Sequence, residues 1–202
     1  MKDKGKIDLL LHNGVVVTMD ARGRVFDPGA VAVEGGRIVA VGPEEEVAGR
    51  FHPAEAVDCR DAAIIPGLIN GHGHAAMSLL RGLRDDLQLD VWLFGYMLPV
   101  ETRFVNEEFV RWGTLLACAE MIRGGNTTFV DMYYFEDAVA AAADQAGLRA
   151  LCAETIMKLP TPDATSYDES LAYARRFIER WRSHERIIPA LGPHSAYTTT
   201  PA

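Results

Sequence analysis

The feature that most constrains this chain is an apolar run that ends in two histidines spaced one residue apart. Residues 64–70 read Ile-Ile-Pro-Gly-Leu-Ile-Asn, and Gly71-His72-Gly73-His74 follows directly. Residues i and i+2 of an extended chain point to the same side, so both imidazoles can face one point beyond a strand's carboxyl end. Converging neutral imidazoles suit a divalent cation such as Zn, Fe or Ni. His72 and His74 are therefore predicted to be metal ligands.

The alternative is that both histidines are solvated loop residues. Their context argues against this reading, because Pro66-Gly67 interrupts the apolar run before it resumes and small residues flank both imidazoles. Glycine at positions 71 and 73 lets the backbone approach a ligand closely. We therefore favour the metal site over the solvated loop.

The segment from Pro66 to His74, continued by residues 75–82 (Ala-Ala-Met-Ser-Leu-Leu-Arg-Gly), resembles the metal-dependent amidohydrolases. It is most similar to the branch that holds methylthioadenosine and S-adenosylhomocysteine deaminases, guanine-type deaminases and triazine chlorohydrolases. The resemblance implies an α/β fold, a (β/α)8 TIM-type barrel, whose first strand ends in His72 and His74. It also implies one catalytic divalent metal, with zinc preferred and iron or nickel as alternatives.

Length sets a limit on how much of that barrel this chain holds. A (β/α)8 barrel takes about 250 residues, whereas 128 residues follow His74. We therefore expect a fragment, with residues 1–60 as the N-terminal part of a small β-sandwich and residues 61–202 as the first half of the barrel. The resemblance assigns the remaining ligands and the acid–base groups to later strands, so the fragment alone is expected to be inactive.

The hydrophobic pattern changes near residue 62. Before it, short strands are separated by glycine turns, with a tight turn expected at Asn13-Gly14 and a hairpin at Gly35-Gly36. After it, strands and helices alternate, which is typical of a parallel sheet. Strands are expected over residues 64–70, 127–131, 149–155 and 187–192, and helices over residues 107–123, 136–146 and 166–183. The apolar stripe of the first helix is expected at Phe109, Trp112, Leu115, Leu116, Ala119 and Ile122.

Functional side chains of such barrels lie at the carboxyl ends of the strands. Those positions hold Asp131, Glu154 with Thr155, and His194. Residues 192–197 (Gly-Pro-His-Ser-Ala-Tyr) resemble a family block in which the residue matching His194 contacts the substrate, with a purely structural histidine as the alternative. Asp131 could orient backbone or pair with an arginine. Glu154 departs from the nucleoside-deaminase pattern, which tends to carry arginine near this position.

A long connection over residues 75–101 is expected to form a wall of the site. By the resemblance, Trp92 packs near a nucleoside and Glu101 binds ribose hydroxyls. An indole offers a flat apolar surface to a purine, and a carboxylate can accept from two hydroxyls. The alternatives are a core tryptophan and a glutamate on a helix surface.

The implied function is hydrolysis of carbon–nitrogen bonds other than peptide bonds, most simply deamination of a purine nucleoside derivative. A guanine-type deaminase, a triazine chlorohydrolase-like enzyme and a non-catalytic barrel paralogue stay open, although intact His72 and His74 argue against the paralogue. Hydrolysis of N-acyl or cyclic amides often uses two metals bridged by a carboxylated lysine. By the resemblance, that lysine would be expected at the end of the fourth strand, where this chain has His194. The only lysine near that position is Lys158, so a mononuclear site is preferred.

Composition restricts the partners. A net charge of −8 argues against a nucleic-acid or anionic-membrane partner, and the expected partner is a small N-heterocycle, with a homo-oligomer left open. Cys59, Cys118 and Cys152 are expected to be small buried residues, not a disulfide or thiolate framework. No segment resembles a signal peptide or membrane span, which favours a cytoplasmic location.

Overall fold

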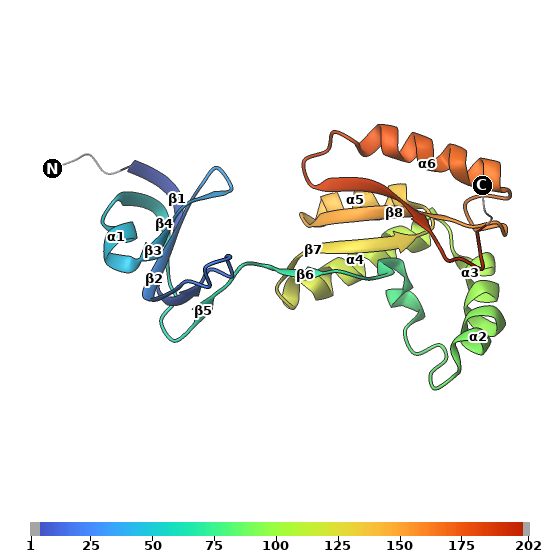
Figure 1. Ribbon diagram of the computed structural model, residues 1–202, viewed down its shortest axis with the longest axis horizontal. Helices are drawn as coiled ribbons and strands as arrows, with labels where there is room; N and C mark the ends of the chain where they lie inside the picture. The colour runs from blue at the N-terminus through green and yellow to red at the C-terminus, as the bar shows by residue number, and fades with distance from the viewer. Residues whose placement is uncertain (1–4, 200–202) are drawn as a thin grey trace. The chain divides into compact units, whose positions relative to one another are not determined.

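The computed structural model describes residues 5–199, which form two compact units, one ending at Pro66 and the next beginning at Gly67 (Figure 1). The first unit is a five-stranded sheet in the order β3-β2-β1-β4, with β5 paired to β1. Its short helix α1 packs on a core that includes Ile7, Leu10 and Val47. The elements are β1 (Gly5–Val17), β2 (Val25–Glu34), β3 (Arg37–Pro43), α1 (Glu44–Ala48), β4 (Phe51–Asp58) and β5 (Ala63–Ile64).

Two turn predictions in this unit have opposite outcomes. The hairpin at Gly35-Gly36 is confirmed, because Glu34 pairs with Arg37 and both glycines have positive φ, 57° and 73°. The tight turn at Asn13-Gly14 is wrong, because β1 continues through both residues. Asn13 adopts φ 62° where the register against β2 shifts, so the pair forms a bulge in one long strand.

The second unit alternates strands and helices as predicted. Its four strands are parallel and lie in the order β6-β7-β8-β9, and the helices pack against them over one apolar core that includes Phe129, Val139 and Phe177. The strands are β6 (Leu68–Asn70), β7 (Asn126–Tyr133), β8 (Arg149–Ile156) and β9 (Ile187–Pro193), and the long helices are α4 (Glu107–Arg123), α5 (Glu136–Ala146) and α6 (Tyr167–Trp181).

The strand predicted over residues 64–70 is divided between two sheets. Ala63 and Ile64 pair with β1, whereas β6 pairs with β7. Gly67 lies in the break and approaches β7 so closely that a Cβ there would lie 2.2 Å from Thr127 Cγ2. The Pro66-Gly67 pair therefore separates two strands that the apolar pattern joined into one.

Helix α4 begins after Asn106, an N-cap whose side chain accepts a 2.9 Å hydrogen bond from the Phe109 N–H. Its predicted apolar stripe is wrong, since Trp112 is 53% exposed. The buried face instead carries mostly small side chains, which let α4 approach the helical turn after His74. That face comprises Val110, Gly113, Thr114, Ala117 and Cys118.

The long connection between β6 and α4 is mostly helical. It contains a 3-10 turn followed by three consecutive helical segments (Figure 1). These are η1 (Ala75–Leu80), α2 (Leu89–Trp92), η2 (Leu93–Met97) and α3 (Leu98–Phe104). Within residues 5–199, no helix is both long enough and apolar enough to span a membrane.

Candidate metal and substrate site

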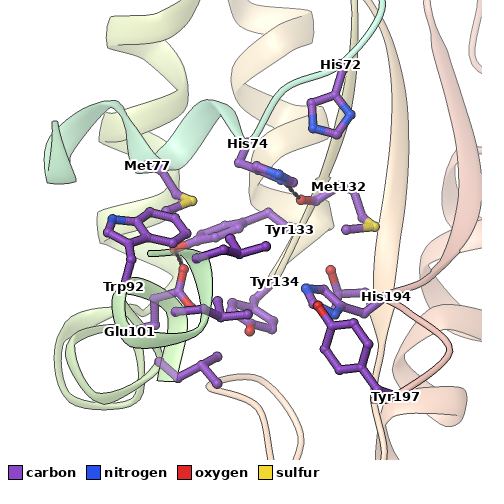
Figure 2. A pocket seen from close by; sticks show the side chains of 14 residues that line it. His72, His74, Met77, Trp92, Glu101, Met132, Tyr133, Tyr134, His194 and Tyr197 are labelled. Atoms are coloured by element: carbon purple, nitrogen blue, oxygen red, sulfur yellow. Dashed lines mark hydrogen bonds between the residues drawn. The ribbon is translucent and has the colours of Figure 1, made fainter. Parts of the chain in front are cut away.

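His72 and His74 follow the end of β6, and their rings are neighbours. The ring centroids lie 5.2 Å apart with the ring planes at 81° (Figure 2). The side chain of Asn70, the last residue of β6, accepts a 3.3 Å hydrogen bond from the His72 N–H. The i, i+2 spacing therefore brings two imidazoles together at a strand end, as the sequence predicted.

The tautomer of His74 follows from its partner. Its Nδ1 lies 2.6 Å from the Met132 carbonyl oxygen, an acceptor, so Nδ1 carries the hydrogen (Figure 2). The neutral ring then keeps a lone pair on Nε2, the atom free to bind a cation. Histidines that bind metals usually donate a hydrogen bond from their other ring N–H to a group such as a backbone carbonyl, as His74 does.

The described residues supply a pair of ligands and no larger set. No group of three or more His, Cys, Asp or Glu side chains within residues 5–199 is arranged to hold a metal ion. A catalytic zinc site normally takes three protein ligands. The two imidazoles therefore fit part of such a site.

The predicted site residues line one cavity. His72, His74, Trp92, Glu101 and His194 surround a space of about 370 Å³ (Figure 2). They come from the end of β6, the helical connection and the end of β9, so the fold brings together side chains that are far apart in the sequence. Their individual roles stay predictions.

Glu101 lies in α3 and is only 5% exposed, so it is not a surface charge. The Tyr133 hydroxyl donates a 2.8 Å hydrogen bond to Glu101 Oε1. Burial raises the pKa of Glu101 above its usual value, and the hydrogen bond from Tyr133 opposes that shift. The cavity thus holds a carboxyl group with one oxygen already fixed by a phenol.

His194 follows β9 and is half-buried. Its Nδ1 lies 3.0 Å from the hydroxyl of Thr198, a buried residue. Burial lowers the pKa of His194, and repulsion from His74 lowers it further. Burial therefore favours the neutral form of His194, which lines the cavity.

Glu154 and Thr155, the candidates at the end of β8, have different surroundings. Thr155 lines the cavity. Glu154 is buried elsewhere and accepts a 3.2 Å hydrogen bond from the N–H of Glu136 at the start of α5. Burial and the nearby Asp163 raise the pKa of Glu154 to about 10. Its departure from the family pattern therefore says little about the substrate.

Several cavity residues were not predicted from the sequence. Tyr133 and Tyr134 follow Asp131 at the end of β7, and Met77 and Tyr197 lie close to predicted residues. The rule that strand ends carry the site, applied beyond titratable side chains, would have found both tyrosines. Of the three cysteines, Cys118 and Cys152 are buried as expected, whereas Cys59 is only partly buried.

Comparisons with known proteins show the family to which this chain belongs. The model of the Amidohydrolase family matches residues 63–202, and that of an imidazolonepropionase-like composite domain from bacteria matches residues 29–54. The chain belongs to the amidohydrolase family. Its α/β fold corresponds to the first half of a (β/α)8 barrel preceded by part of a small β-sandwich.

The similar proteins are deaminases and related hydrolases. A 5-methylthioadenosine/S-adenosylhomocysteine deaminase of Syntrophobacter fumaroxidans is 48% identical over 98% of this chain and 45% of its own length. The solved structure of an adenosine deaminase from Xanthomonas campestris with bound zinc is 44% identical, with a TM-score of 0.94 over 98% of this chain and 45% of that one. An atrazine chlorohydrolase of Arthrobacter aurescens, 23% identical over 96% of this chain and 48% of that one, shares the fold with a TM-score of 0.82. The chain thus spans less than half the length of these proteins.

Proposed function

We propose that the protein containing this chain is a metal-dependent deaminase that hydrolyses the amino group from a purine nucleoside derivative of the methylthioadenosine or S-adenosylhomocysteine class. The observation that carries this proposal is the imidazole pair, with His74 Nε2 left free, on a cavity shared with Trp92 and Glu101. The names of the relatives at 40–48% identity support the substrate class. A cytoplasmic location and a homo-oligomer stay predictions.

His72 and His74 would hold the metal. Their nitrogen donors suit zinc, and iron or nickel would also accept them. A bound divalent metal lowers the pKa of a water so that hydroxide forms near neutral pH. Because two imidazoles are fewer than a catalytic site needs, we expect residues 1–202 alone to bind metal weakly and to turn over little.

Three cavity residues would select the substrate. Trp92 offers an apolar ring face to the purine, and the Glu101 carboxyl group can accept hydrogen bonds from ribose hydroxyls. His194, whose Nδ1 contacts the Thr198 hydroxyl, would make a hydrogen bond to the base. The buried Glu101 favours a nucleoside over a guanine-type or triazine-type substrate, because neither of those carries a ribose.

The proposal is tested with the full-length protein, zinc and methylthioadenosine, by following ammonia release and metal content. His74→Asn and His72→Asn should each lower both, whereas His52→Asn, on an exposed histidine of β4, should change neither. Turnover of guanine or a triazine in preference to the nucleoside would contradict the substrate class. A wild-type protein that binds no metal would favour the non-catalytic paralogue.

A further inference from the structure

Hydrogen bonds from the end of β7 hold the turn that carries the two histidines. The Met132 carbonyl accepts from His74 Nδ1–H, and the Met132 N–H donates to the Gly73 carbonyl at 3.3 Å. One residue earlier, Asp131 Oδ1 accepts a 2.5 Å hydrogen bond from the Ala75 N–H. Three hydrogen bonds from two adjacent residues thus reach three consecutive residues, Gly73, His74 and Ala75.

Asp131 is the only side chain among these three contacts on β7, and it is fully buried. Its second oxygen, Oδ2, is also buried and has no hydrogen-bond donor among the described residues. A buried carboxylate oxygen without a hydrogen-bond donor has lost its water and gained no partner, which is destabilising. Asp131 Oδ2 therefore needs a hydrogen-bond donor.

Glu136 can supply that donor. It is fully buried at the start of α5, and neither of its carboxyl oxygens has a partner among residues 5–199. Its carboxyl group lies close enough to Asp131 that the Asp131 charge adds to burial in raising the pKa of Glu136 well above its usual value. Two acceptors so placed can bond only if one carries a proton. A protonated Glu136 would therefore give Asp131 Oδ2 a hydrogen-bond donor.

Among residues 5–199, the charged groups that act on this pair include Glu154 and the two histidines, which act to lower the pKa of Asp131. Glu154 lies beside Glu136 and is itself held neutral, with its pKa raised to about 10 by burial and by Asp163. No arginine or lysine within residues 5–199 forms an ion pair with Asp131 or Glu136. Of the two roles that the sequence left open for Asp131, the structure therefore favours orienting backbone over pairing with arginine.

We propose that Asp131, backed by a hydrogen bond from Glu136, is a positioning residue that holds the His72–His74 turn in its metal-binding shape before a metal arrives. This inference rests on the metal role proposed for the two histidines. Asp131 is not among the residues that line the cavity. It acts through the Ala75 backbone, which immediately follows His74.

The test measures zinc affinity of the full-length protein by competition with a chelator, alongside thermal unfolding of the metal-free protein. Asp131→Ala should weaken zinc binding by about 10- to 100-fold, the usual effect of losing a residue that orients a ligand. Asp131→Asn keeps an acceptor for the Ala75 N–H and should weaken zinc binding much less than Asp131→Ala does. Glu136→Gln keeps a donor and should stay near wild type, whereas Glu136→Leu should resemble Asp131→Ala.

Asp137→Ala is the matched control. Asp137 lies next to Glu136 but pairs with Arg180 and accepts from Trp181 Nε1, so its loss should lower stability without changing zinc affinity. Equal zinc affinity in Asp131→Ala and wild type would overturn the inference. If Asp131→Ala does not fold, equal zinc affinities in Glu136→Gln and Glu136→Leu would overturn it. If the wild-type protein binds no zinc, the proposed function is wrong. If His74→Asn loses zinc affinity but Asp131→Ala does not, the proposed function stands and only this inference is wrong.

Discussion

The hydroxyl of Tyr133 donates a 2.8 Å hydrogen bond to Glu101 Oε1, and both residues are buried beside the candidate site. Tyr133 belongs to β7 and Glu101 to α3, so this bond ties the helical connection to the barrel sheet (Figure 2). It occupies one carboxyl oxygen of Glu101. Under the proposed function, the second oxygen would accept a hydrogen bond from the ribose of the substrate.

Tyr133→Phe should weaken nucleoside binding. Loss of a hydrogen bond to a buried charged group costs about 1.5–3 kcal/mol, so we expect KM for methylthioadenosine to rise by roughly tenfold or more. The variant should also lose its preference for methylthioadenosine over the analogue that lacks both ribose hydroxyls. Steady-state kinetics with the two compounds check this, with Tyr167→Phe at the start of α6 as the control. An unchanged preference would remove Glu101 from the ribose site.

Glu154→Gln should change how stability depends on pH. The folded pKa of Glu154 is about 10, against about 4.3 for an unfolded glutamate. Because the folded state holds the proton more tightly, the contribution of Glu154 to stability is complete below about pH 4.3 and is lost as pH rises toward 10. Because glutamine does not titrate, the free energy of unfolding of Glu154→Gln should fall less steeply with rising pH than that of the wild-type protein. Urea unfolding between about pH 6 and about pH 9 measures it.

Glu185→Gln, on an exposed glutamate, is the control for this experiment and should keep the wild-type pH dependence. If Glu154→Gln loses stability with rising pH as steeply as wild type does, Glu154 is not a buried neutral acid.

Gly113→Ala should disturb the turn that follows His74. A Cβ at Gly113 would lie 2.3 Å from the Ala76 carbonyl oxygen, and a backbone atom cannot easily move aside. Overpacking of this kind costs about 1–3 kcal/mol, so we expect a lower free energy of unfolding and weaker zinc binding. Gly95→Ala is the matched control, because Gly95 is also helical and a Cβ there meets nothing within 4 Å. Equal effects of the two substitutions would show that α4 does not support the histidine turn.

The parts of the site that the sequence predicted depend on local spacing or on a family motif. The His72–His74 pair needs only the two-residue period of an extended chain, and His194 was found through the block around it. The Met132 carbonyl that sets the His74 tautomer is a backbone atom, so no side-chain identity at position 132 reveals it. Asp131 was noticed as a strand-end acid, but its partner Ala75 is 56 residues away.

The parts of the fold that were mispredicted have physical reasons. On α4, large apolar side chains suggested the buried face, yet close packing on η1 demands small ones such as Gly113. Tertiary packing therefore outweighed residue hydrophobicity. At Asn13, a residue that tolerates positive φ serves a bulge as well as a turn, and only the strand pairing tells the two apart.

The most direct test of the account is the position of the metal in crystals of the full-length protein, located by anomalous scattering at the zinc absorption edge. We predict one zinc at about 2.0–2.1 Å from His74 Nε2 and from a ring nitrogen of His72, with His74 Nδ1 still bonded to the Met132 carbonyl. Zinc bound away from both rings, or an empty site in protein that turns over its substrate, would contradict the account.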